Sequence, residues 1–593
     1  MDSQTLLPST ITEAFRRTVE AARDRVAVRT IDDAVSLTWG EMARRVDALA
    51  GGLAKLGVRR ADTVALLLSN RPEFHVADLA AVMLGATPFS LYQTLPPEQI
   101  AYVVGDAGAR VVVVEAAFLP SILRARERVP RLEHVIVVDG DGAEGTLALA
   151  EVEGSNPGFD VESAWRAVTP DDLLTLIYTS GTTGPPKGVQ LTHRNFIACA
   201  KVVQALVPLP QGARVISWLP AAHVAERAAH HYLPVVFGCT ITCCPNPREL
   251  ISYLPQVRPE WFFAVPRIWE KLKAGLEVRL ASLPDAQRAQ VEQALAAGYE
   301  KVRLEQAGQP VPTALAARVS EADAGLFAPL RAALGLDAAL AVNAGAAPTP
   351  RDVIEFFHAI GIRLGELWGM SETTGTGAVN PLDRIKIGTV GPPVPGVEIK
   401  LAPDGEVLIR GDVVMAGYRN QPEKTAEVLD RDGWLATGDI GEIDADGYLR
   451  IVDRKKEIII SSSGKNMSPA NIEAVLKSTC PLVGQACVIG DRRPYVTALL
   501  VLDPDFAPAW AAQQGLAGRT LEQLAAEPAV VAAVQTDIDR TNERLSRVEQ
   551  VKKFHIIPGD WQPGGDELTP TLKLKRKPIA EKYAAAIEAM YAG

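Results

Sequence analysis

The chain has few cysteines and no long apolar run. It has six cysteines among 593 residues. Three of them, Cys239, Cys243 and Cys244, cluster without the CxxC spacing of zinc sites, which favours buried free thiols in a reducing compartment. The longest apolar segment, 79–92, is broken by a glycine and a proline and is too short to span a membrane. Residues 1–17 lack the basic and apolar regions of a signal peptide. These absences predict a soluble, cytoplasmic protein and leave peripheral membrane contact open.

Basic residues are outnumbered, 61 against 71 acidic ones, and the formal net charge is −10. A protein that binds nucleic acid generally needs a basic surface, so no nucleic-acid partner is expected. The hydrophobic fraction of 47% and the charged fraction of 22% are ordinary for a globular protein. The sequence does not decide between a monomer and a homodimer.

Two common nucleotide-binding motifs are also missing. In the segment 178-YTSGTTGPPKGVQLTHRN-195, a Walker motif read from Gly181 fails. Pro186 stands where the second glycine belongs, and Gly188 stands where the hydroxyl belongs. Two successive prolines also prevent a helix from starting there. No GxGxxG sequence follows a strand, so a dinucleotide-binding fold is unsupported.

The same segment is nevertheless rich in groups that bind phosphate. A predicted strand over 173–181 leads into a loop of hydroxyls, glycines and one lysine. Backbone N–H groups and hydroxyls of such a loop can surround a β,γ-diphosphate, and the lysine adds charge. The residues expected to do so are Thr179, Ser180, Gly181, Thr182, Thr183, Gly184 and Lys187.

Strands and helices alternate along most of the chain, which predicts parallel, doubly wound sheets. Residues 270–340 are rich in Ala, Glu, Arg and Leu and are expected to form a solvated helical insertion. From about residue 385, short strands with Gly, Pro and Asp turns favour a small β-barrel or sandwich. The predicted strands of the alternating part are 63–70, 87–92, 110–115, 134–139, 215–220, 239–244, 261–266, 339–348 and 363–369.

Five more motifs follow the loop in a fixed order: 218-WLPAAHVAER-227, 343-NAGAAP-348, 367-LWGMSET-373, 433-GWLATGDIGEIDADGYLRIVDRKKE-457 and 568-LTPTLKLKR-576. Together with the loop they resemble the AMP-forming adenylate superfamily of acyl-CoA synthetases, luciferases and peptide-synthetase adenylation domains. The resemblance covers nearly the whole chain and implies an α/β fold. Residues 1–453 would form a large N-terminal domain of two doubly wound α/β subdomains plus a small β-barrel. Residues 454–593 would form a smaller, mobile C-terminal α+β domain that carries the catalytic lysine.

The resemblance also implies where ATP and Mg²⁺ bind. Glu372 would hold Mg²⁺, a hard cation that prefers oxygen ligands, and Thr179 would face the same ion. Trp368 would lie against adenine, and Asp439 would accept the ribose hydroxyls. The other residues implied around the nucleotide are Gly345, Ala346, Gly369, Ser371, Thr373 and Arg454.

Lys573 is the implied catalytic lysine. A carboxylate must attack the α-phosphate of ATP, and a cation that touches both anions stabilises the charged transition state. The family pattern resembles SGKIxR, whereas this chain has Leu572 in place of the glycine. Alignment on Arg576 favours Lys573 over Lys575. Lys456 occupies the family's hinge position.

Three features resemble long-chain fatty-acid–CoA ligases: the TPTLKLKR ending, 265-VPRIWEK-271, and the long helical insertion after it. The resemblance includes the bubblegum-type branch of these ligases, for which 356-FFHAIGI-362 is the segment to compare. Arg227 departs from relatives that gate the acyl tunnel with tryptophan. His223 is either structural or a residue of the tunnel wall near the substrate carboxylate. The loop 461–466, with Gly464, resembles the family's passage for the CoA thiol arm.

The implied function has two steps. A fatty acid and MgATP give acyl-AMP and pyrophosphate, and CoA then takes the acyl group. The alternatives are a fatty-acyl-AMP ligase that loads an acyl carrier protein, an aryl or medium-chain acid–CoA ligase, and a non-catalytic adenylate sensor. The CoA-side loop, and the lack of an insertion at 370–410, argue against the first. Intact Glu372, Asp439 and Lys573 argue against the last.

Overall fold

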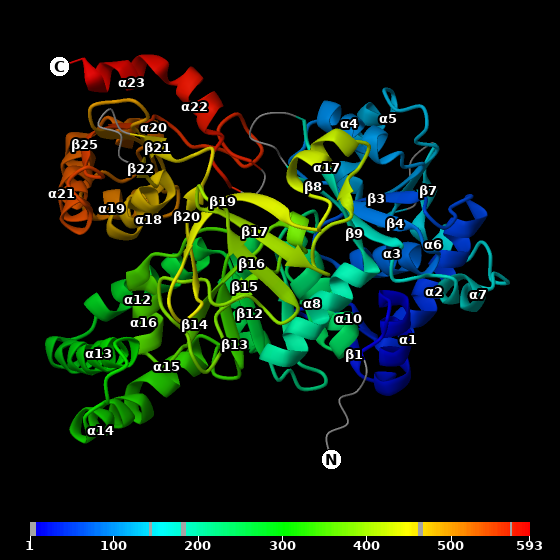
Figure 1. Cartoon of the computed structure of the whole chain (residues 1–593), viewed down its shortest axis with the longest axis horizontal. Helices are drawn as coiled ribbons and strands as arrows, with labels where there is room; N and C mark the ends of the chain where they lie inside the picture. Colours follow the sequence, from blue (N-terminus) through cyan, green and yellow to red (C-terminus); the bar gives the residue numbers. More distant parts are fainter. Residues whose placement is uncertain (1–6, 141–144, 180–184, 461–465, 570–571, 593) are drawn as a thin grey trace.

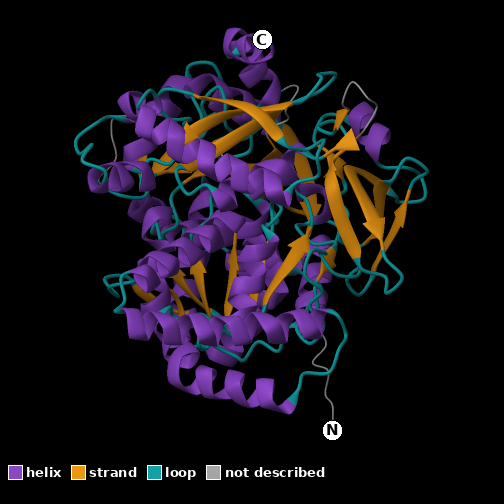
Figure 2. Cartoon of the chain, turned by 90° about the vertical axis from the view of Figure 1, so that its left-hand side faces the viewer, coloured by secondary structure: helices purple, strands orange, loops and turns teal. Residues whose placement is uncertain are grey.

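The computed structural model describes residues 7–140, 145–179, 185–460, 466–569 and 572–592. Figure 1 follows the chain from the blue N-terminal layer through the green middle to the orange and red C-terminal part. Figure 2 shows that helices cover the sheets in the lower half of the molecule. Within these ranges no helix has the length and apolarity needed to cross a membrane.

The first sheet is parallel throughout, in the order β4-β3-β5-β6-β7. Its strands β3, β4 and β5 are fully buried because helices cover both faces, which explains their continuous apolar runs. The strands are β3 (Thr63–Leu67), β4 (Thr87–Ser90), β5 (Val111–Val114), β6 (His134–Val137) and β7 (Leu147–Ala148). The helices that follow the first three of these strands in sequence are α3 (Pro72–Met83), α4 (Pro97–Ala107) and α5 (Leu119–Arg126).

A second set of strands forms two four-stranded sheets, β10-β11-β1-β2 and β12-β13-β14-β15. All neighbours are parallel except the last pair of each sheet. The first sheet contains β10 (Arg214–Ser217), β11 (Thr240–Cys243), β1 (Val26–Thr30) and β2 (Ser36–Thr38). The second contains β12 (Trp261–Ala264), β13 (Ala341–Ala344), β14 (Leu364–Trp368) and β15 (Ala378–Val379).

The β-rich region contains two antiparallel sheets. One has the order β16-β17-β19-β20, with strands β16 (Val397–Leu401), β17 (Glu406–Gly411), β19 (Leu435–Ile443) and β20 (Leu449–Arg454). The other has the order β18-β9-β8, with strands β18 (Gly417–Tyr418), β9 (Lys187–Thr192) and β8 (Leu173–Thr179). Strand β9 was not among the predicted strands. Lys187 therefore opens a strand that pairs antiparallel with β8.

The predicted helical insertion is present and lies at the lower left of Figure 1 in green. It packs back on the second sheet system through helix α16 (Arg351–Ala359), which lies so close that a Cβ at Gly298 would be 2.4 Å from the Ala359 carbonyl oxygen. The insertion contains α12 (Pro266–Ala281), α13 (Asp285–Gln306), α14 (Thr313–Ala322) and α15 (Ala328–Ala333).

The C-terminal part is a mixed α+β unit built on the sheet β23-β24-β25. It lies against α12 and α16, as the upper left of Figure 1 shows, and charged pairs cross the contact. Arg267 pairs with Asp503, Lys271 Nζ lies 2.7 Å from Asp505 Oδ2, and Arg544 contacts Asp352. Its elements include β21 (Ile459–Ile460), β22 (Asn466–Met467), α18 (Pro469–Thr479), β23 (Val483–Ile489), β24 (Val496–Leu502), α19 (Phe506–Gln513), α21 (Pro528–Arg544), β25 (Val551–Ile556), α22 (Arg576–Lys582) and α23 (Ala584–Tyr591).

Candidate active site

The candidate site begins where parallel strands β13 and β14 end. In α/β sheets ligands bind beyond the carboxyl ends of such strands. Gly345 and Ala346 follow β13, and Trp368 ends β14. A Cβ at Gly369 would lie 2.3 Å from the carbonyl carbon of Gly375, so only glycine permits this turn. The turn leads into the short helix η5 (Ser371–Thr373).

Trp368, Asp439 and Arg454 form one connected group. The Trp368 indole Nε1 donates a hydrogen bond to Asp439 Oδ2 over 2.8 Å. Arg454 Nε lies 2.8 Å from the other Asp439 oxygen, and the two residues are direct partners across β19 and β20. Burial raises the pKa of Asp439 above its ordinary value, and the Arg454 charge opposes that shift. The structure therefore brings the three predicted nucleotide-side residues together.

Glu372 faces the small sheet that contains β18. The Tyr418 hydroxyl donates a hydrogen bond to Glu372 Oε1 over 2.8 Å. The Lys187 ammonium lies 4.6 Å from the centroid of the Tyr418 ring. Lys187 is also the strand partner of Thr179. Burial, and then the Glu372 charge, raise the pKa of Tyr418, so the phenol keeps its proton and remains a donor.

Several predicted phosphate-loop and CoA-side residues lie outside the described residues: Ser180, Gly181, Thr182, Thr183, Gly184 and Gly464. The two ends of the phosphate loop are described. Thr179 ends β8 opposite Lys187 at the start of β9. In η5, Ser371 is half-buried, while the buried Thr373 hydroxyl accepts the Met370 N–H over 3.0 Å.

Lys573 reaches the site from the C-terminal part. A hairpin holds it, because the Thr569 N–H donates to the Lys573 carbonyl and the Lys573 N–H donates to Thr569 Oγ1. The preceding residue, Leu572, has φ +63, a left-handed conformation that favours the glycine it replaces. Although solvent reaches part of the side chain, the surrounding protein lowers the pKa of Lys573 below its ordinary value, and Arg454 lowers it further.

Two predicted site carboxylates lie near enough to Lys573 to affect its pKa. Asp439 and Glu372 both act to raise the pKa of Lys573. Lys575 points elsewhere, since its Nζ donates to the Gly565 carbonyl of the same C-terminal part over 2.8 Å. The arrangement thus favours Lys573 over Lys575 as the catalytic candidate.

His223 lies near the same lysine. Its Nδ1 accepts the Ala225 N–H over 3.2 Å, which leaves Nε2 as the nitrogen that carries the proton in the neutral ring. Burial, and then the Lys573 charge, lower the pKa of His223 to about 4. A neutral N–H donor therefore lies beside the catalytic candidate at neutral pH.

Two further residues singled out in the sequence, Lys456 and Arg227, have different surroundings from each other. Lys456 is exposed in the turn after β20, a suitable place for the predicted hinge. Arg227 is fully buried and pairs with Asp78 over 2.5 Å. It also donates to Tyr232 and Ser90. Its guanidinium is therefore fixed by residues of α3 and β4.

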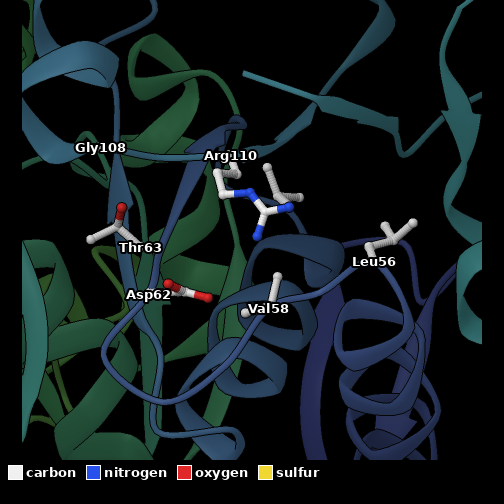
Figure 3. A pocket seen from close by; sticks show the side chains of 7 residues that line it. Leu56, Val58, Asp62, Thr63, Gly108 and Arg110 are labelled. Atoms are coloured by element: carbon white, nitrogen blue, oxygen red, sulfur yellow. The ribbon is translucent and has the colours of Figure 1, made fainter. Parts of the chain in front are cut away.

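No sequence motif indicated Tyr418 as a residue of the site. It lies in a strand of two residues, too short for a periodic signal, and its contact with Glu372 spans 46 positions. A small hollow elsewhere, shown in Figure 3, is lined by residues that include Asp62, Thr63 and Arg110. It lies at the amino ends of β3 and β5, opposite the edge where ligands bind such sheets.

Comparisons with known proteins place this geometry in a family. The model of the AMP-binding enzyme family matches residues 15–419, and that of the AMP-binding enzyme C-terminal domain matches residues 456–593. The long-chain-fatty-acid–CoA ligase FadD15 of Mycobacterium bovis is 35% identical over 96% of this chain and 94% of its own length. The long-chain-fatty-acid–CoA ligase ACSBG2 of Xenopus laevis is 31% identical over 100% of this chain and 85% of its own.

Among solved structures, the anthranilate CoA ligase AuaEII in complex with anthranoyl-AMP matches with a TM-score of 0.75. It is 21% identical and covers 99% of this chain and 100% of its own. This match confirms the predicted fold class. The family matches confirm the resemblance drawn from the sequence motifs, and the chain belongs to the AMP-binding enzyme family.

Proposed function

We propose that this protein is an ATP-dependent ligase that converts a long-chain fatty acid to acyl-AMP, releasing pyrophosphate, and then transfers the acyl group to CoA. The observation that carries the proposal is the position of Lys573, which comes from the C-terminal part and lies close enough to Asp439 and Glu372 for both carboxylates to act on its pKa. The names of the two relatives above support a long-chain fatty acid as substrate and CoA as acceptor.

In the first step, different residues would bind different parts of ATP. Asp439 and Arg454 would hold the ribose, and Trp368 would pack beside the adenine. Lys573 would contact the α-phosphate and the fatty-acid carboxylate together, lowering the repulsion between two anions. His223 is near enough to Lys573 for the lysine charge to lower its pKa, and its Nε2–H could donate to the same carboxylate.

The donors near Glu372 fit a magnesium ion. Glu372 is a buried carboxylate with one oxygen bonded to Tyr418, and its second oxygen is the kind of hard ligand that Mg²⁺ prefers. Thr179 would supply a hydroxyl from the end of β8. When bound, the ion would neutralise charge on the phosphates of ATP.

CoA would enter from the C-terminal part. A hollow there is lined by residues that include Arg493, Tyr495, Arg547 and Lys552, beside Met467 of β22. Cationic and aromatic side chains are suited to the phosphates and adenine of CoA. Rotation about the exposed Lys456 would withdraw Lys573 and bring this face to the adenylate, so that one site serves both steps. A cytoplasmic location, where both ATP and CoA are available, is part of the proposal, and six buried free cysteines support it.

The test is a pyrophosphate-release screen over C2 to C24 fatty acids and aryl acids, with acyl-CoA measured by mass spectrometry. We expect the highest kcat/KM with long-chain fatty acids and acyl-CoA as product. A uniform response to all fatty acids, or a preference for aryl acids, would refute the long-chain assignment. Acyl transfer to a carrier protein but not to CoA would favour the fatty-acyl-AMP ligase.

Lys573→Ala provides the internal control. It removes the cation from both anions, and we expect adenylate formation to fall by at least ~100-fold, as for loss of one charge-stabilising donor. Lys575→Ala removes a cation bonded to Gly565 and should leave adenylate formation close to normal. The reverse pattern would assign the role to Lys575.

A further inference from the structure

Tyr418 has a fixed position beside Glu372. Its backbone N–H donates to Thr425 Oγ1 over 2.9 Å, and it pairs with Val189 in β9. Its neighbour Gly417 has φ +145, and a Cβ there would lie 2.9 Å from the Thr425 side chain. Helix α17 (Pro422–Val428), which contains Thr425, therefore packs closely on this strand. The tyrosine side chain is buried and has little freedom to move.

Among the described residues, the Glu372 carboxylate accepts a hydrogen bond from Tyr418 alone, which leaves one oxygen for a ligand. The hydroxyl contacts Oε1 only, over 2.8 Å. A neutral donor fixes the rotation of a carboxylate without cancelling its charge, whereas an arginine or lysine at that place would compete with a cation. Carboxylates that bind metals are commonly held in this way by a hydrogen bond from a neighbouring residue.

Glu372 is also tied to the same segment through its backbone. The Met415 N–H donates to the Glu372 carbonyl over 2.9 Å, and the Ala416 N–H donates to the Gln190 carbonyl. Residues 415–418 therefore connect η5, which carries Glu372, to β9, which begins at Lys187. Tyr418 therefore links the Lys187 end of β9 to Glu372.

Lys187 completes the arrangement. Its ammonium lies 4.6 Å from the Tyr418 ring centroid, on the ring, while the hydroxyl end of that ring contacts Glu372. An ammonium over an aromatic face is held less strongly than one paired with a phosphate. The ring thus separates the cation from the carboxylate and keeps both available for a metal–phosphate complex.

We propose that Tyr418 is a positioning residue, which orients Glu372 to bind a divalent cation and holds Lys187 apart from that carboxylate. The inference rests on the proposed function, because it assumes that Glu372 binds the cation of the ATP complex. It adds a residue that the sequence motifs did not indicate. Its effect acts through Glu372 and does not require Tyr418 to touch ATP.

The experiment compares Tyr418→Phe with Tyr178→Phe. Tyr178 lies in β8 of the same sheet, and its hydroxyl donates to the Asp106 carboxylate over 2.7 Å, away from Glu372. Each variant loses one hydroxyl bonded to a carboxylate. Binding of Mn²⁺ in the presence of α,β-methylene-ATP is followed by the loss of the free-ion signal in electron paramagnetic resonance, and thermal unfolding checks the fold.

We expect Tyr418→Phe to raise the half-saturating Mn²⁺ concentration by ~10–100-fold, with Tyr178→Phe close to the wild type. Pyrophosphate release by Tyr418→Phe should recover as the Mg²⁺ concentration is increased, which a general packing defect would not produce. An unchanged Mn²⁺ affinity, or an equal loss in both variants, would overturn the inference. Absence of pyrophosphate release by the wild type with any acid would instead refute the proposed function.

Discussion

Trp368 and Asp439 are joined directly, by a hydrogen bond of 2.8 Å from the indole Nε1 to Oδ2. The bond links the end of β14 to the middle of β19, which are 71 positions apart. It means that one residue expected at adenine also orients the carboxylate expected at ribose. The aromatic ring and its polar N–H group therefore have separate roles that substitutions can distinguish.

Trp368→Phe keeps a ring but removes the donor to Asp439. A hydrogen bond to a charged group contributes ~1.5–3 kcal/mol, so the ATP KM should rise by roughly 10- to 150-fold with kcat little changed. The measurement is pyrophosphate release against ATP concentration. Trp269→Phe is the matched control, because the buried Trp269 Nε1 has no hydrogen-bond partner among the described residues. Equal ATP KM values in the two variants would contradict this role.

The pKa of Lys573 lies below its ordinary value. Because the step needs the ammonium, and a cation is lost as pH rises through its pKa, adenylate formation should fall on the alkaline side below pH ~10.5. The pKa of His223, about 4, keeps that ring neutral above pH ~5, so it contributes no acidic limb near 6.5. The measurement is kcat/KM for pyrophosphate release against pH.

Lys573→Arg keeps the positive charge but changes the shape of the side chain, and its kcat/KM is measured against pH in the same way. A guanidinium stays protonated throughout this range, so the alkaline limb should disappear although the rate is lower. The same limb in Lys573→Arg and the wild type would assign it to another group.

Sequence motifs predicted most residues of the candidate site, as three of those residues illustrate. Trp368, Glu372 and Asp439 each lie in a recognisable run, so the sequence could name them before the structure showed Trp368 and Asp439 in contact. Lys573 had a competitor two positions away, and only the hydrogen bond of Lys575 to Gly565 separates the two geometrically. The roles of these residues remain predictions.

The sequence did not indicate which strands pair with strands far away in the chain. Strand β1 near the N-terminus pairs in parallel with β11, where Val28 is opposite Ile241. Alternating apolar residues indicate a strand but do not identify its partner. Strand β9 was missed because the prolines and glycines before it indicate a turn and the helix after it begins at His193. Tyr418 could not be recognised from the sequence, because its position depends on pairing with that missed strand.

Arg267 and Lys271 of α12 pair with Asp503 and Asp505 of the C-terminal part. If that part rotates after the first step, both pairs must break. The Arg267→Ala/Lys271→Ala double variant should slow adenylate formation by at least about 2-fold, since an exposed pair such as Lys271–Asp505 contributes ~0.2–1 kcal/mol and the Arg267 pair, whose Asp503 is buried, is less screened by solvent. Formation of acyl-CoA from synthetic acyl-AMP should not fall.

The two half-reactions are measured separately, by pyrophosphate exchange and by acyl-CoA formation from acyl-AMP. Arg258→Ala is the control, because its pair with Asp337 lies wholly outside the C-terminal part. Equal slowing of both half-reactions would show that these pairs do not favour one domain arrangement over another.

Asp78 and Arg227 form a fully buried pair, with both side chains 0% exposed and 2.5 Å between Nη1 and Oδ2. Arg227→Met removes the guanidinium partner of the buried Asp78 and leaves it only the His231 and Tyr232 contacts, which should cost ~3–5 kcal/mol. Thermal unfolding should then shift down by roughly 2–4 °C for each kcal/mol. Asp78→Asn combined with Arg227→Met removes the buried charge and should recover part of the loss. Arg288→Met, which breaks an exposed pair with Asp285, should have little effect.

The pH dependence of the same variants tests the cause. In the wild type the Arg227 charge and hydrogen bonds hold the pKa of Asp78 below its ordinary value despite burial, so this pair loses stability only as pH falls through that low pKa. In Arg227→Met the guanidinium no longer opposes burial, and only the His231 and Tyr232 contacts still lower the pKa of Asp78, so that pKa rises from its wild-type value. The destabilisation caused by Arg227→Met should therefore become smaller as pH falls and Asp78 becomes protonated. A midpoint of unfolding for Arg227→Met that keeps the wild-type pH profile would show that the guanidinium is not what stabilises the Asp78 carboxylate.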